Sequence, residues 1–74
     1  MCRETREELV RLIVKNGFVY IDELKSKKDV SIEVEKLGIV KTKKNGKRGF
    51  TVPRQYRRKP ALRRMYFRWN LNFA

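Results

Sequence analysis

The chain has 74 residues, of which 41% are apolar and 38% are charged. Its 20 Lys and Arg residues outnumber its 8 Asp and Glu residues, so the formal net charge is +12. A chain of this length forms one small domain with a single core, and so much like charge in a compact domain indicates a polyanionic partner.

Composition also excludes several functional classes. The chain has no histidine and its single cysteine is Cys2, which excludes Cys/His zinc sites, histidine-activated nucleophiles and a disulfide within one chain. The apolar runs are far shorter than the roughly 20 residues of a transmembrane helix, and no secretory leader opens the chain. We therefore expect an intracellular protein, cytoplasmic or nucleoid-associated, that is not an enzyme and needs no metal or cofactor.

The charge is distributed very unevenly along the chain. Residues 1–40 hold eight Lys or Arg and all eight Asp or Glu, whereas residues 41–74 hold the other twelve Lys or Arg and no acid. The second half also contains aromatic residues throughout, unlike a disordered basic tail. This pattern predicts a folded, basic surface that binds nucleic acid.

The first half predicts three helices and a short strand. Thr5 and Glu8 have the spacing of a capping box, which predicts a helix over residues 6–16 that ends at Gly17. Residues 18–20 are strand formers. We expect a second helix over residues 23–28 with Asp22 as its cap, although Asp22 and its acidic neighbours could also be considered for acid–base chemistry. A third helix, capped by Asp29 or Ser31, would end near Leu37 and Gly38.

A β-hairpin follows, because Asn45-Gly46 lies between two alternating segments, residues 39–44 and 47–52. A three-residue loop over residues 45–47 would place Val40, Thr42, Phe50 and Val52 on one face. A two-residue loop would set Lys41 beside Phe50, so we expect the longer loop.

The last predicted element is an amphipathic helix from Pro60 to about residue 70. One apolar stripe runs along it, formed by Leu62, Met65, Tyr66, Trp69 and Phe73. Exposed together, these side chains would form a large apolar patch, which predicts a homodimer. Packing of this helix on the first helix of the same chain is the competing expectation.

The order helix, strand, helix, turn, helix and basic hairpin resembles a winged helix-turn-helix domain. The residues that carry the resemblance are Ile21-Asp22-Glu23-Leu24, the segment 34–40 and the hairpin tip from Lys43 to Arg48. The resemblance covers about residues 6–52. We therefore expect an α+β, mainly α, fold, with a winged-helix core over residues 1–53 and a basic-aromatic extension over residues 54–74.

The resemblance implies binding of double-stranded DNA, with the third helix in the major groove and the hairpin, or wing, on the backbone or in the minor groove. By position, Ser31, Glu33 and Lys36 would face the groove, although Glu33 and Glu35 depart from the pattern because phosphate repels them. The expected nucleic-acid-binding residues are Ser31, Lys36, Lys41, Lys43, Lys44, Lys47, Arg48, Arg54, Arg57 and Arg58.

Two alternatives to a small DNA-binding transcriptional regulator stay open. Some ribosomal proteins also use winged-helix cores, and the basic-aromatic C-terminal segment would suit RNA, by stacking and by phosphate neutralisation. A non-specific architectural DNA-binding protein would use the same basic residues for affinity without reading sequence.

Overall fold

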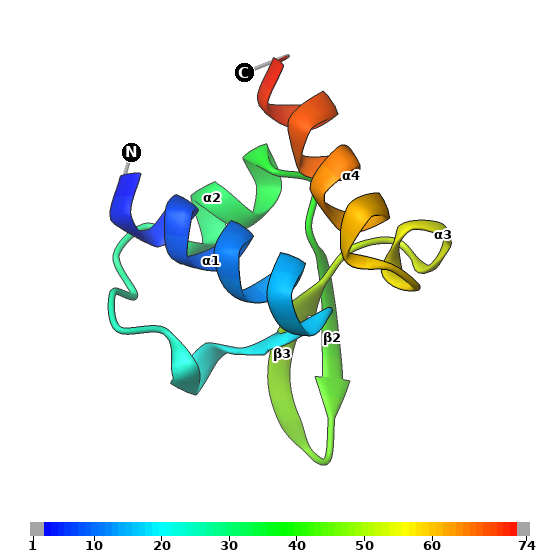
Figure 1. The fold of residues 1–74 in the computed structure, drawn as a ribbon. Coiled ribbons are helices and arrows are strands. Elements are labelled where there is room, and N and C mark those ends of the chain that lie inside the picture. The colour runs from blue at the N-terminus through cyan, green and yellow to red at the C-terminus, as the bar shows by residue number, and fades with distance from the viewer. Residues whose placement is uncertain (1–2, 73–74) are drawn as a thin grey trace.

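The computed structural model describes residues 3–72, and their side chains as far as residue 69 (Figure 1). The elements in chain order are α1 (Arg3–Asn16), β1 (Val19–Tyr20), the 3-10 helix η1 (Ile21–Glu23), α2 (Val30–Lys36), β2 (Val40–Lys44), β3 (Lys47–Thr51), α3 (Arg54–Arg57) and α4 (Pro60–Asn72). This α+β fold has the layout of a small winged helix-turn-helix domain with a β-hairpin wing and a C-terminal helix. Among the described residues, no helix is long and apolar enough to cross a membrane.

The three strands form an antiparallel sheet in the order β1-β3-β2, with β3 in the centre. Lys44 pairs with Lys47, so the hairpin turn contains two residues, Asn45 and Gly46. Both have positive φ, 55° and 76°, as a two-residue type I′ turn requires. The expected three-residue loop is therefore wrong, and Lys41 does lie opposite Phe50.

The central position of β3 explains this register. Phe50, Thr51 and Val52 are all buried in succession, so side chains on both faces of the end of this strand are covered. Val40, by contrast, is 38% exposed on the edge strand β2. Where consecutive residues of a strand are all buried, apolar and polar residues do not alternate along the sequence. The sequence pattern then does not determine the register of the hairpin.

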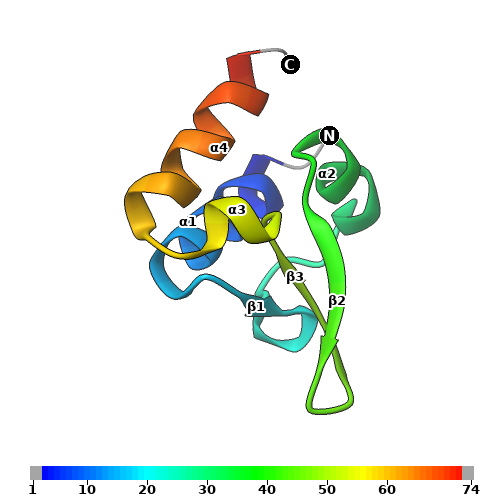
Figure 2. The same cartoon turned by 90° about the vertical axis from the view of Figure 1, so that its right-hand side faces the viewer.

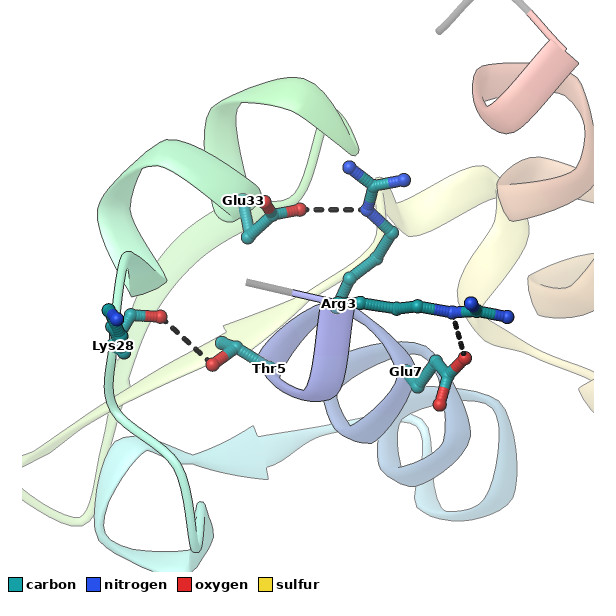
Figure 3. Close-up of polar contacts among 6 residues, drawn as sticks. Arg3, Thr5, Glu7, Lys28 and Glu33 are labelled. Carbon is teal, nitrogen blue, oxygen red and sulfur yellow. Dashed lines mark hydrogen bonds and ion pairs between the residues drawn. The ribbon is translucent and has the colours of Figure 1, made fainter. Parts of the chain in front are cut away.

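Helix α1 begins at Arg3, so Thr5 and Glu8 lie inside it and do not form the expected capping box. Both side chains are buried and tie α1 to the loop before α2. The Thr5 hydroxyl donates to the carbonyl oxygen of Lys28 at 2.9 Å (Figure 3). The Glu8 carboxylate accepts hydrogen bonds from the backbone N–H groups of Lys25 and Ser26.

The other helix boundaries follow the sequence in part. Gly17 and Gly38, with φ of 80° and 66°, lie just past the ends of α1 and α2, as expected for glycine stops. The expected helix over residues 23–28 is wrong, since the 3-10 turn η1 ends at Glu23 and residues 24–29 form no helix. Asp29 precedes α2 with a φ of 56°, and its side chain does not cap the helix.

Helix α4 packs on α1 (Figure 2), and the apolar residue that it buries most deeply lies off the expected stripe. Phe67, which lies off that stripe, is 1% exposed and joins the core with Leu9 and Ile13 of α1. Met65 and Trp69 are 46% and 64% exposed. The inner face of α4 is therefore rotated relative to the apolar stripe in the sequence.

Candidate nucleic-acid interface

The start of α2 and one face of the β2–β3 hairpin enclose a groove of about 790 Å³, which we call the wing groove. Four cationic side chains line it, two from β2, one from β3 and one from the loop before α2: Lys41, Lys43, Arg48 and Lys27. Asp29 is the one acid among the lining residues. The groove therefore carries a clear excess of positive charge.

The hairpin register brings three of these cations to the same face. Lys43 lies directly opposite Arg48, and residues paired across antiparallel strands project to the same side. Lys41 is two residues before Lys43 on β2 and projects to that side too. Its partner Phe50 is 6% exposed and contributes to the apolar floor of the groove, together with Ile21.

Helix α2 contributes Ser31 and Ile32 to the opposite wall of the wing groove, and both are exposed. Ile32 is 49% exposed, although it is a large apolar residue. Lys36 lies in the last turn of α2, exposed but outside the lining of the groove. Of the residues expected to bind on this helix, only Ser31 thus lines the groove.

The sequence led us to expect that the Glu33 side chain would be exposed and face the major groove of DNA. This expectation is wrong. Its side chain is fully buried between α2 and α1, where it accepts a hydrogen bond from the Arg6 Nε at 2.8 Å (Figure 3). Its other oxygen, Oε1, has no hydrogen-bond partner. Glu33 therefore joins two helices, whereas the other acid of α2, Glu35, is exposed.

The wing tip, residues 44–47, carries two more cations on the other face of the hairpin. Lys44 lies over the ring of Phe18, with its Nζ 5.5 Å from the ring centroid. Lys47 lies over the ring of Tyr20 at 5.9 Å. The two rings pack edge to face, with centroids 4.8 Å apart, and give both lysines an aromatic support.

A glycine makes this aromatic support possible. Gly49 lies beneath the Phe18 ring, and a Cβ at this position would overlap the Cζ atom of Phe18. The φ of Gly49 is not positive, so close packing rather than backbone conformation explains the glycine.

The remaining expected site residues, Arg54, Arg57 and Arg58, lie on or next to α3 and are exposed. Helix α3 follows the end of β3 that is remote from the wing tip (Figure 1). Arg57 donates from Nη2 to the carbonyl oxygen of Val52 at 3.2 Å. These arginines form a separate basic region and do not line the wing groove.

Arg63, another arginine of residues 41–74, is buried and holds helices together. Arg63 is 7% exposed and donates from Nε to Val14 O and from Nη1 to Arg57 O, at 3.0 and 2.6 Å. These carbonyls lie near the ends of α1 and α3, where a cation is favoured by the helix dipole. The guanidinium thereby joins α4 to both helices.

Some residues of the expected dimer stripe are half-buried within the chain, and others are exposed. Tyr66 donates its hydroxyl to Gly38 O at 2.6 Å and packs on Tyr56, with ring centroids 4.8 Å apart. Leu62 is half-buried, whereas Met65 and Trp69 are exposed. The side chain of Phe73 lies outside the described residues.

The sequence reasoning missed Lys27, Ile21 and Ile32 as groove-lining residues. The signal for Lys27 was its place in the Lys-rich segment just before α2.

Within residues 3–72, no group of His, Cys, Asp or Glu is arranged to hold a metal ion. Comparisons of the chain with protein-family models, curated proteins and solved structures found no match.

Proposed function

We propose that this protein binds double-stranded DNA through the wing groove and acts as a small winged-helix regulator of transcription. The observation that carries the proposal is the convergence of Lys27, Lys41, Lys43 and Arg48 on one groove beside α2. Phosphate contacts of this kind supply most of the affinity of DNA-binding proteins. Such a protein would work in the cytoplasm or on the nucleoid.

Two parts of the groove suit two parts of a duplex. The hairpin would place its cations on the phosphate backbone, while α2 would lie against the base edges of the major groove. Ser31 offers a hydroxyl that can donate or accept, and Ile32 offers an apolar surface for a thymine methyl group. The exposed Glu35 can accept from the amino group of cytosine.

The wing tip would extend the phosphate contacts beyond the groove. Lys44 and Lys47 lie on rings that limit the motion of their long side chains. A lysine held in this way loses less conformational entropy when it binds, so it contributes more of its charge interaction to affinity.

RNA binding of the ribosomal type is the second candidate, and one observation favours it. Trp69 is 64% exposed on the basic helix α4, next to the exposed Arg68. An exposed indole on a helix that also exposes arginines suits stacking on unpaired bases. A non-specific architectural role on DNA would use the wing groove without base contacts from α2.

A competition experiment separates these candidates. The purified protein is bound to a labelled 30-base-pair duplex at fixed salt and is competed with duplex DNA, single-stranded DNA and structured RNA. The proposal predicts that duplex DNA competes best, and that K41Q/K43Q/R48Q binds the duplex at least ten times more weakly. The control R3Q/K25Q/K28Q removes the same charge from exposed residues outside the groove and should bind within about threefold of the wild type. Preferential competition by RNA would refute the proposal.

A homodimer through α4 completes the proposal for a regulator. Met65 and Trp69 are the exposed apolar residues available for it, since Tyr66 already contacts Gly38 within the chain. Two chains paired by this face would present two wing grooves to a symmetric site.

A further inference from the structure

A second basic cleft lies between α1 and α4, away from the wing groove. It has a volume of about 460 Å³, and we call it the α1–α4 cleft. Arg11 and Lys15 of α1 and Arg64 of α4 line it, and all three are exposed. Its apolar lining comes from Val10, Val14 and Pro60.

No acid lines this cleft, and the arrangement of charge on its helices explains why. The acids of α1 occupy the N-terminal half of the helix, at Glu4, Glu7 and Glu8, whereas the cleft lies at its C-terminal half. Glu7 pairs with Arg3, and Glu8 is directed into the loop before α2. Helix α4 has no acid at all. The three cations of the cleft therefore lie in a locally positive field.

The α1–α4 cleft and the wing groove share no lining residue, and the helices beside them differ. Viewed as in Figure 2, α1 and α4 lie toward one side, and α2 and β2 lie toward the other. Even along the shortest principal axis the chain measures 17 Å. The Debye length at physiological salt is about 8 Å, so ions in the solution around the chain would screen part of the repulsion between two bound polyanions.

We propose that the α1–α4 cleft binds the phosphate backbone of a second DNA duplex, so that one chain bridges two duplexes. This inference rests on the proposed function, because the first duplex occupies the wing groove. Arg11, Lys15 and Arg64 would contact phosphates, and the apolar lining would contact deoxyribose carbons. We expect these side chains to contact phosphates and deoxyribose rather than base edges, so that the second duplex is bound without sequence preference.

A capture assay tests bridging directly. One duplex of 40 base pairs is fixed on beads, a second labelled duplex of unrelated sequence is added, and the protein is supplied below saturation. The fraction of labelled duplex retained on the beads measures bridging, while fluorescence anisotropy with the labelled duplex alone measures binding to one duplex.

The variant R11Q/K15Q/R64Q removes the three cations of the cleft. We expect it to capture the second duplex at least about ten times less well, since three phosphate contacts are lost, and to bind one duplex within about threefold of the wild type. The matched control R3Q/K25Q/K28Q removes three charges elsewhere and should capture as the wild type does. Circular dichroism verifies that each variant is folded, as expected for exposed positions.

The other outcomes overturn the inference in distinguishable ways. Undiminished capture by R11Q/K15Q/R64Q would show that another surface, such as a dimer with two wing grooves, holds the second duplex. A wild type that binds one duplex and captures none would refute bridging and leave the proposed function intact. A wild type that binds no duplex would refute the proposed function, and bridging with it.

Discussion

The salt dependence of DNA binding is a quantitative test of the wing groove. Six cations would contact phosphates, the four that line the groove and the two at the wing tip, Lys44 and Lys47. Each phosphate contact contributes about −0.9 to the slope of log K against log salt, so six contacts predict a slope of about −5.4. A fourfold rise in salt, from 50 to 200 mM, would then lower the affinity about 1,800-fold.

Removal of one cross-strand pair should change this slope by a known amount. In K43Q/R48Q two contacts are lost, which predicts a slope of about −3.6 and only about a 150-fold loss over the same salt range. The variant K25Q/K28Q removes the same charge from exposed residues that do not line the groove and should keep the wild-type slope. The slopes are measured by fluorescence anisotropy at five or more salt concentrations. Equal slopes for K43Q/R48Q and K25Q/K28Q would refute the assignment, because affinity would then depend on net charge alone.

Three further predictions concern packing and assembly. Gly49→Ala should destabilise the fold by about 1–3 kcal/mol in urea unfolding because its Cβ overlaps Phe18, and the cost should nearly vanish in a Phe18→Ala background. Arg6→Met should cost about 3 kcal/mol, because it leaves the buried Glu33 carboxylate without its cation, and a loss below about 1 kcal/mol would contradict this. Trp69→Ala should convert a concentration-dependent dimer to a folded monomer in sedimentation experiments, and a wild type that stays monomeric at high micromolar concentration would end the dimer hypothesis.

The order of the elements was predictable from the sequence because local signals determine it. Gly17 and Gly38 end two helices through their positive φ, and Asn45-Gly46 forms the hairpin turn for the same reason. Pro60 begins α4, where its missing N–H costs no hydrogen bond. These signals act within a few residues, so a single sequence suffices to find them.

Features that depend on distant partners were not predictable in this way. The hairpin register was missed because Phe50 and Thr51, which project to opposite faces of the central strand β3, are both buried, so burial does not alternate along the strand. Thr5 and Glu8 match a capping box, but their partners are 17 to 23 residues away, across the α1–α2 contact. Phe67 is buried because α1 covers it, although it lies outside the apolar stripe of its own helix.

The cations of the wing were predictable from charge, whereas Ser31 was expected from its position in the winged-helix resemblance. The excess of bases after residue 40 indicated the wing and its tip, and four of the expected residues, Ser31, Lys41, Lys43 and Arg48, meet in the wing groove. Glu33 could not be distinguished from a groove residue, because its burial depends on Arg6, 27 residues away. Lys27 was missed because it belongs to the neutral half of the chain.

The partners of the buried charged groups explain how so basic a chain can fold and keep its excess positive charge on the surface. In residues 1–40, acids are used for structure, since Glu33 pairs with Arg6 and Glu8 accepts from backbone N–H groups. In residues 41–74 the buried Arg63 guanidinium donates hydrogen bonds to two backbone carbonyl oxygens. These carbonyls accept hydrogen bonds from its N–H groups without neutralising its charge. Residues 41–74 contain no Asp or Glu that could pair with the exposed Lys and Arg residues of this half. Folding therefore leaves the charge of the wing, α3 and α4 uncompensated, and a bound polyanion would neutralise it.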